Sequence, residues 1–143
     1  MKTTLTRGVS LIESVVTLGV VMLLITGLVV GMTASLQNAQ GSKSRALAVQ
    51  YAQEAFEIMR QERDTNWATF AARGAQINYC MDGTGLLSAP IDGTCPPFAG
   101  TFSRKMTFVL TDPKEMNVVV IVSWTEGNST KNVTLQTKYT QWK

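Results

Sequence analysis

Gly8-Val9-Ser10-Leu11-Ile12-Glu13 is the stretch that decides the fold, because an apolar run from Val15 to Met32 follows it directly. No ionisable side chain occurs between Val15 and Ser42. About 20 apolar residues are enough for a helix to cross the hydrocarbon core of a bilayer. Glu13 is the exception, and an ionisable group in such a zone costs roughly 2.5–3.5 kcal/mol on insertion scales. The sequence therefore predicts a membrane helix with a functional carboxylate near its start.

The residues before this helix follow a fixed order: the basic Lys2 and Arg7, then Gly8, then Glu13 five positions later. This order resembles the class III leader of type IV prepilins and type II secretion pseudopilins. The resemblance implies that prepilin peptidase cuts after Gly8 and that Val9 becomes the N-methylated N-terminus. It also implies that Glu13 governs assembly. Val9 stands where phenylalanine is commonest in the family.

The pairing of Glu13 also has a physical reason. Cleavage would leave a positive amine on Val9, four residues before the carboxylate and within lipid. The amine of one subunit and Glu13 of a second could neutralise each other, because a buried charge is tolerated only with a partner. This pair would favour one axial offset between the helices of neighbouring subunits. The alternative is that Glu13 caps or snorkels at the membrane edge of an ordinary signal anchor.

Two of the three net positive charges belong to the leader. Cleavage would remove Lys2 and Arg7 and leave 11 basic side chains against 10 acidic ones. Positive residues before a membrane helix hold that end in the cytoplasm. We therefore expect a single pass through the bacterial inner membrane, with the leader cytoplasmic and the head outside. Thr33-Ala34-Ser35 could imitate an ordinary signal cleavage site, which keeps a secreted form open as an alternative.

Helical periodicity continues beyond the apolar run. Residues 43–63 carry an apolar stripe at spacings of three and four, and its members are Leu47, Tyr51, Ala55, Ile58 and Met59, beside Ala48, Ala52 and Phe56. Residues 9 to 64 could therefore form one helix of about 55 residues. The cluster Asp64-Thr65-Asn66 predicts its end, and Trp67 and Phe70 are expected in the core.

Cys80 and Cys95 lie beyond the membrane segment, and an even number of cysteines in an exported domain favours a disulfide over two free thiols. They fall in residues 74–100, which are rich in glycine and proline and are expected to form a long surface loop. Asp82 and Asp92 there precede glycines. They predict turns, because the ligand pattern of a calcium-binding EF-hand is missing.

Three stretches with period-two patterning follow, and they are enriched in β-branched residues. Met106, Phe108 and Leu110 mark the first apolar face, and Val118, Val120 and Val122 belong to the second. Val133, Leu135 and Tyr139 mark the third. Asp112-Pro113 and Glu126-Gly127-Asn128 predict the reversals between them. An antiparallel meander results, and its apolar face can cover the stripe on residues 43–63.

The second half of the chain extends the resemblance. The stretches Ala52–Arg60, Arg63–Trp67, Val122–Trp124 and Tyr139–Lys143 resemble small minor pilins and pseudopilins of the I/V kind. The resemblance implies an α+β, type IV pilin-like fold. Its long N-terminal α-helix has a membrane-spanning first half and an amphipathic second half, and it packs on a small C-terminal antiparallel β-sheet.

The expected organisation divides the chain into four parts. Residues 1–8 form the leader, 9–36 the transmembrane and assembly helix, and 37–66 the amphipathic helix. Residues 67–143 form the head, with a disulfide-restrained loop at 74–100 and the sheet at 101–143.

No residue pattern points to catalysis. The chain has no histidine, no Walker loop and no dinucleotide-binding glycine motif, so neither an enzyme nor a metal or cofactor is expected. Arg104, Lys105 and Lys138 could cluster on the sheet, but three charges are few against the six to ten phosphate contacts of a firm binder. Nucleic acid is therefore not expected as a direct ligand.

The expected function is a structural one. The chain is interpreted as a minor pilin or pseudopilin subunit of a type IV pilus or type II secretion pseudopilus. Its partners would be prepilin peptidase, other pilin or pseudopilin subunits, the inner-membrane assembly platform and membrane lipid. Assembly would place it in a cell-surface or periplasmic fibre. The alternative is a non-polymerising membrane-anchored or secreted binding module.

Overall fold

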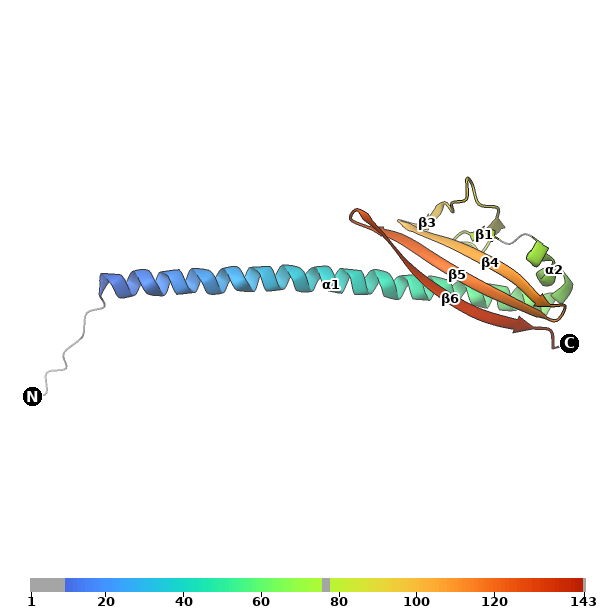
Figure 1. Cartoon of the computed structure of the whole chain (residues 1–143), viewed down its shortest axis with the longest axis horizontal. Coiled ribbons are helices and arrows are strands. Elements are labelled where there is room, and N and C mark those ends of the chain that lie inside the picture. Colours follow the sequence, from blue (N-terminus) through green and yellow to red (C-terminus); the bar gives the residue numbers. More distant parts are fainter. Residues whose placement is uncertain (1–9, 76–77, 143) are drawn as a thin grey trace, which may run out of the picture. The chain divides into compact units, whose positions relative to one another are not determined.

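The computed structural model describes residues 10–75 and 78–142 (Figure 1). Helix α1 spans Leu11–Thr65, helix α2 Trp67–Ala72 and the 3-10 turn η1 Arg73–Ala75. The strands are β1 (Asn78–Met81), β2 (Leu87–Ser88), β3 (Pro97–Ala99), β4 (Phe102–Asp112), β5 (Glu115–Glu126) and β6 (Ser129–Thr140). The expected α+β layout is confirmed: a long N-terminal helix packs on a small antiparallel sheet.

The chain divides into two compact units, residues 1–40 and 41–143. The described part of the first unit is helical from Leu11 onward, and all of its side chains are exposed. The second unit, which we call the head, contains every buried residue of the described chain. The hydrophobic core therefore belongs entirely to residues 41–143.

Within the head, α1 is held by the apolar stripe that its sequence predicted. Ala48, Ala52, Ala55 and Met59 are buried at spacings of four, three and four residues, which places them on one face of the helix. Tyr51, Phe56 and Ile58 pack beside them and are partly buried. Three of the four buried residues are alanines, so little side-chain bulk stands between this face of the helix and the sheet.

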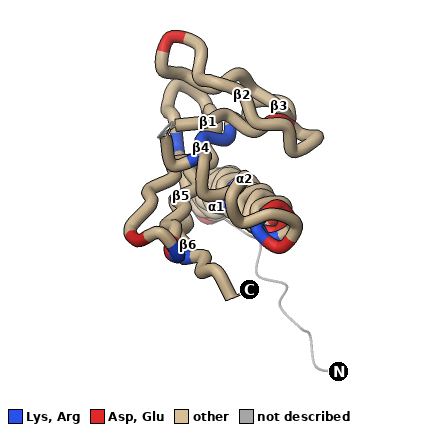
Figure 2. The backbone as a smooth tube through the Cα atoms, turned by 90° about the vertical axis from the view of Figure 1, so that its right-hand side faces the viewer, with Lys and Arg blue, Asp and Glu red and all other residues tan. Residues whose placement is uncertain are grey.

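The predicted meander is confirmed in β4, β5 and β6. All three strands pair antiparallel, and β5 and β6 are in register over their whole length, from Glu115 opposite Thr140 to Glu126 opposite Ser129. On β5 every second residue from Met116 to Trp124 is buried, because successive side chains point to opposite faces of a sheet. Figure 2, which views the head along α1, shows these strands on one side of the helix.

The expectation of a long surface loop at residues 74–100 is wrong in part. Three short strands lie in it, and the sheet has the order β2-β1-β4-β5-β6, with β3 also pairing with β4. Asn78, Tyr79 and Cys80 of β1 pair with Thr107, Met106 and Lys105 of β4. Backbone hydrogen bonding to an existing strand therefore draws this segment into the sheet. Strand β6 is the outermost strand on the other side.

The end of α1 lies where the sequence predicted it, at Thr65, but a second short helix follows. Asn66 adopts an extended conformation, and its side chain accepts a hydrogen bond from the Thr69 backbone N–H at 3.2 Å, which caps α2. Phe70 on α2 is fully buried and meets the rings of Phe108 and Tyr139 edge-on. Helix α2 thus closes one end of the core.

Candidate functional site

Glu13 lies in the first turn of α1 and is exposed. Its neighbours Leu11 and Ile12 are 83% and 71% exposed, and the next ionisable residue along the helix is Lys43. Among the residues that the structure describes, none forms an ion pair with Glu13. The partial positive charge of a helix N-terminus favours a carboxylate at this position. The expected cleavage and methylation residues, Gly8 and Val9, lie outside the described residues.

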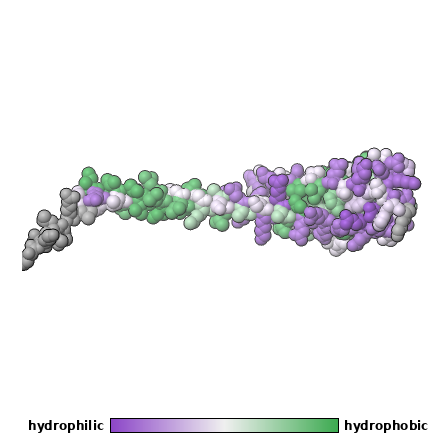
Figure 3. Space-filling view, turned by 90° about the horizontal axis from the view of Figure 1, so that it is seen from below, coloured by the Kyte–Doolittle hydropathy of each residue, from purple (hydrophilic) through white to green (hydrophobic). Residues whose placement is uncertain are grey.

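The segment that follows exposes its apolar side chains without exception. Every large apolar residue from Leu11 to Leu36 is exposed, with values between 48% at Val21 and 83% at Leu11. Figure 3 shows the hydrophobic colouring along this part of the helix. By length and composition, α1 could cross a membrane.

The threonine hydroxyl groups of this segment are satisfied within the helix. The side chains of Thr17, Thr26 and Thr33 donate hydrogen bonds to the backbone oxygens of Ser14, Met22 and Val30 at 2.8 to 3.0 Å. Polar groups without partners are costly in hydrocarbon, and bonding back to the helix removes this cost. The segment is therefore chemically suited to lipid despite its threonines.

Cys80 and Cys95 are bonded to each other in the structure, so the pair named from the sequence is the pair that meets. Cys80 is buried in β1, and Cys95 is partly buried just before β3. Between them, the Asp82 carboxylate accepts hydrogen bonds from the Thr84 and Leu86 backbone N–H groups and from the Thr84 hydroxyl. The Thr84 hydroxyl, followed by the Leu86 N–H, lowers the pKa of Asp82. Asp82 thus supports a turn, as expected.

Arg104 is a feature that the sequence reasoning missed. It lies on β4 with no exposed surface, and its two terminal nitrogens donate hydrogen bonds to the backbone oxygens of Tyr51 (2.8 Å) and Asp82. The Phe98 ring lies 4.6 Å from the guanidinium carbon, and the nearest carboxylate, Glu54, is 3.7 Å away. Burial lowers the pKa of Arg104, and the charge of Glu54 opposes this effect. The sequence did contain a sign of this position: Arg104 is two and four residues from Met106 and Phe108, so all three lie on the same face of β4.

This position of Arg104 overturns the idea of a basic cluster on the sheet. Arg104 faces the core, whereas Lys105, its neighbour on β4, points to the opposite face. Lys138 forms an ion pair with Glu115 at 2.9 Å. The three charges therefore do not form one surface. Leu110, expected in the core, is 45% exposed, although Gly74 of η1 lies close to its side chain.

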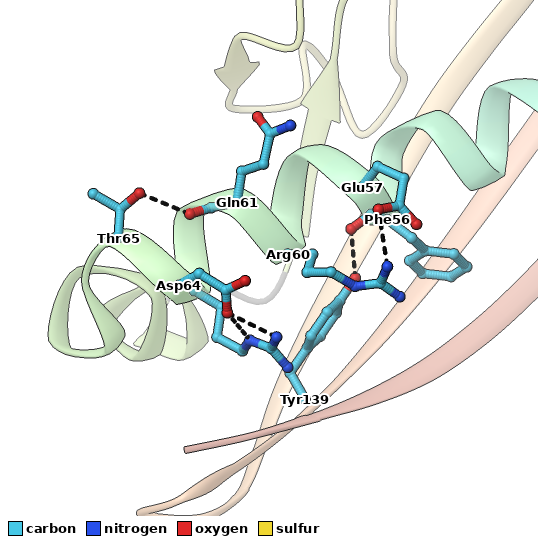
Figure 4. A network of polar contacts seen from close by, with 8 residues as sticks. Phe56, Glu57, Arg60, Gln61, Asp64, Thr65 and Tyr139 are labelled. Atoms are coloured by element: carbon cyan, nitrogen blue, oxygen red, sulfur yellow. Dashed lines mark hydrogen bonds and ion pairs between the residues drawn. The ribbon is translucent and has the colours of Figure 1, made fainter. Parts of the chain in front are cut away.

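A polar and aromatic network joins the end of α1 to the last strand (Figure 4). The Tyr139 hydroxyl donates a hydrogen bond to the Phe56 backbone oxygen at 2.7 Å, and burial raises the pKa of Tyr139 to about 12. Arg63 pairs with Asp64, and its guanidinium carbon lies 5.5 Å from the ring centres of Tyr139 and Trp142. These contacts fix the last turns of α1 against β6.

Beside this network lies an open recess of about 410 Å³. It is lined by Arg63, Asp64, Thr65, Trp67, Gln141 and Trp142. Trp67 is fixed by a hydrogen bond from its indole N–H to the Pro113 backbone oxygen, whereas Trp142 is 70% exposed. The recess combines aromatic surface with one cation and one anion that pair with each other. Within residues 10–75 and 78–142, no group of three acidic, cysteine or histidine side chains is placed to hold a metal.

Comparison of the chain with protein-family profiles, with curated proteins and with solved structures finds no match.

Proposed function

We propose that this chain is a structural subunit, a minor pilin or pseudopilin, of a type IV pilus or a type II secretion pseudopilus. It is made with residues 1–8 as a leader, cut after Gly8 by prepilin peptidase and methylated on Val9. It then leaves the inner membrane for a fibre through an assembly platform. The resemblance of residues 7–13 to the prepilin leader supports this proposal, together with the exposed apolar helix that follows.

The membrane stage uses the segment from Leu11 to Leu36. Its side chains are exposed and apolar, so lipid provides the environment in which their exposure costs least. Its threonine hydroxyls bond back to the helix, so no polar partner is needed from the bilayer. The charge at Glu13 is then the one large penalty in the segment.

The assembly stage removes that penalty. When a second subunit enters, its N-terminal amine neutralises Glu13, and the two apolar helices pack along each other. An unpaired charge in hydrocarbon opposes association at any other stagger, so the pair selects one register between neighbours. The single observation that carries the proposal is an acidic residue at the start of the otherwise uncharged and exposed part of α1 from Leu11 to Gln40.

The first experiment determines the N-terminus of the mature protein. We expect Val9. Met1 would indicate an uncut membrane anchor, and a residue near Ser35 would indicate ordinary signal cleavage with release of the head; either result would contradict the fibre subunit. The variant Gly8→Ala should leave the full-length chain in the membrane, whereas normal processing of this variant would overturn the assigned cleavage site.

The second experiment tests the role of Glu13 in assembly. The variant Glu13→Gln keeps the shape of the side chain and removes its charge, and Glu13→Ala removes both. We expect both variants to be cut normally but to enter fibres at least tenfold less than the wild type, as measured by immunoblotting of sheared fibres. Ser14→Ala, a neutral change at the next position, is the control and should assemble normally. Wild-type incorporation of Glu13→Gln would exclude a charge-based register.

A second candidate function is a membrane-anchored binding module. The recess beside Trp67 and Trp142 favours it, because exposed aromatic side chains next to arginine are typical of binding hot spots. Such a module would keep its membrane helix without polymerising. Neither the wild type nor its Glu13→Gln variant would then enter fibres. The second experiment therefore separates the two functions, because a fibre subunit loses incorporation only in the variant.

A further inference from the structure

Arg104 connects three parts of the head that are distant in sequence. One terminal nitrogen of its guanidinium bonds to the Tyr51 carbonyl on α1, and the other bonds to the Asp82 carbonyl. Its face lies over the ring of Phe98. Asp82 follows Cys80 by two residues and Phe98 follows Cys95 by three, so both lie just beside the disulfide. Arg104 thus ties α1 to both ends of the segment that the disulfide closes.

The Arg104 side chain depends on these partners because it has few others. It has no exposed surface, and its Nε–H has no hydrogen-bond partner in the structure. The nearest carboxylate, Glu54, lies 3.7 Å away on a side chain that is 47% exposed, which weakens its attraction through solvent screening. A buried cation that loses a hydrogen bond carries the full cost of desolvation. Displacing the Asp82 carbonyl would therefore destabilise the position of Arg104.

The segment between the two cysteines has few contacts of its own, and the closest are Gly85 beside Ile58 and the partly buried Leu87 against the core. From Asp82 to Thr94 no residue is buried, and β2 pairs with β1 at only two positions. Segments with few buried contacts open at low free energy. The disulfide removes most of this freedom by closing the segment. The disulfide therefore helps to hold the Asp82 carbonyl against Arg104, together with the pairing of Met81 with Leu87.

We propose that the disulfide and Arg104 form a redox-sensitive latch that fixes α1 on the sheet at Tyr51. In the oxidised chain, both ends of the segment are fixed and the two terminal nitrogens of Arg104 are bonded to Tyr51 and Asp82, with Phe98 over its face. A dithiol reductant transfers two electrons and two protons to the Cys80–Cys95 bond, which yields two thiols and leaves the reductant as a disulfide. The segment then opens, Arg104 loses the Asp82 carbonyl, and the guanidinium draws water into the contact between β4 and α1.

The latch makes the docking of α1 depend on the redox state around the head. In a reducing compartment α1 is held by its buried face and by the hydrogen bond from Tyr139 to Phe56, whereas in an oxidising one Arg104 also keeps its full set of partners. Oxidation therefore completes the contact between helix and sheet. This inference uses only the head and does not rest on the proposed assembly function.

A double-mutant cycle on the full chain in detergent micelles tests the latch. The four proteins are the wild type, Cys80→Ser with Cys95→Ser, Arg104→Met, and the combination. Methionine keeps an unbranched, flexible apolar stem, although a shorter one, and removes the charge and the donors. We expect loss of the disulfide to lower the folding equilibrium constant more in the Arg104 background than in the Met background, by on the order of tenfold. Equal losses in both backgrounds would overturn the latch.

Hydrogen exchange measured by mass spectrometry gives a second readout that needs no variant. Reducing the wild-type protein with dithiothreitol should accelerate exchange of the backbone amides in residues 48–58 of α1. Arg63→Met is the matched control: it removes an arginine that also stacks on aromatic rings but does not touch the disulfide segment, and its response to reduction should equal that of the wild type. Unchanged exchange in residues 48–58 after reduction would overturn the proposal even if the variants failed to fold.

Discussion

Tyr139 shows how one side chain connects the last strand to the helix. It is buried on β6, and its hydroxyl reaches the Phe56 carbonyl on α1 across the core. The Phe70 ring packs edge-on against its ring. The hydroxyl must stay protonated in this environment, because a buried phenolate would have no adequate solvation.

This burial predicts a loss of stability in alkali. The folded-state pKa of Tyr139 is about 12, above the ordinary value of 10, so the unfolded chain loses this proton first. The contribution of Tyr139 to stability is therefore complete below pH 10 and falls between pH 10 and 12. Tyr139→Phe should be less stable than the wild type by ~1 kcal/mol at pH 8, and this difference should shrink above pH 10 and reverse before pH 12. Denaturant titrations of both proteins at several pH values measure it; a constant difference would contradict the assignment.

At the residue scale, the sequence predicted the burial of side chains whose position follows from the local pattern. Ala48, Ala52 and Met59 were predicted on the buried face because helical periodicity alone places them there. The alternation of β4 places Arg104 on the core face with Met106 and Phe108, but the partners that make a buried arginine possible come from residues 51 and 82. Such a contact depends on tertiary packing, which no local pattern encodes.

At the scale of elements, the close approach between the disulfide segment and α1 depends on Gly85. Its φ of +87° belongs to the region that favours glycine, and a Cβ there would lie 2.8 Å from Cδ1 of Ile58. Only glycine combines this backbone conformation with the short distance to Ile58; any larger residue would force the Ile58 side chain to move.

This approach predicts the effect of replacing Gly85. Gly85→Ala should destabilise the head by about 1–3 kcal/mol, because backbone strain and the contact with Ile58 act together. Gly100→Ala is the matched control, since Gly100 also has a positive φ (63°) but nothing within 4 Å of its would-be Cβ. The unfolding temperature of Gly85→Ala should therefore be lower than that of Gly100→Ala. The reverse order would show that the contact is unimportant.

The elements themselves were largely readable from the sequence. The reversals at residues 112–114 and 126–128 carry their own turn chemistry, so β4, β5 and β6 were placed correctly. Strands β1, β2 and β3 were not predicted, since they have two to four residues each and lie among glycines and prolines. Their strand conformation comes from pairing with β4, and pairing partners are not visible in a short stretch.

At the scale of the whole molecule, the two units have different requirements. The head holds the core, from Ala48 to Tyr139, and residues 11–36 contribute exposed apolar surface without contributing to that core. The stability of the head should therefore not depend on the first unit.

This separation predicts that residues 41–143 fold alone. We expect them to be soluble and monomeric without detergent, and to unfold at the same temperature, within a few degrees, as the head of the full chain in micelles. Circular dichroism and size-exclusion chromatography measure both properties. The full chain without detergent should aggregate through its exposed apolar helix. An unfolded 41–143 fragment would show that residues 1–40 stabilise the head.

Because β6 is the edge strand of the sheet, it could pair with a strand of another molecule. One side of this strand is paired with β5 along its full length, and its other side presents backbone groups that another chain could adopt as a template. Lys131 lies opposite Trp124, whose side chain is on the core face, and Lys138 lies opposite Asn117, whose side chain is on the other face. Each face of β6 therefore carries one lysine. A strand from another molecule joining this rim would have to desolvate both ammonium groups. The molecule can thus be packed at high local density while edge-to-edge aggregation is discouraged.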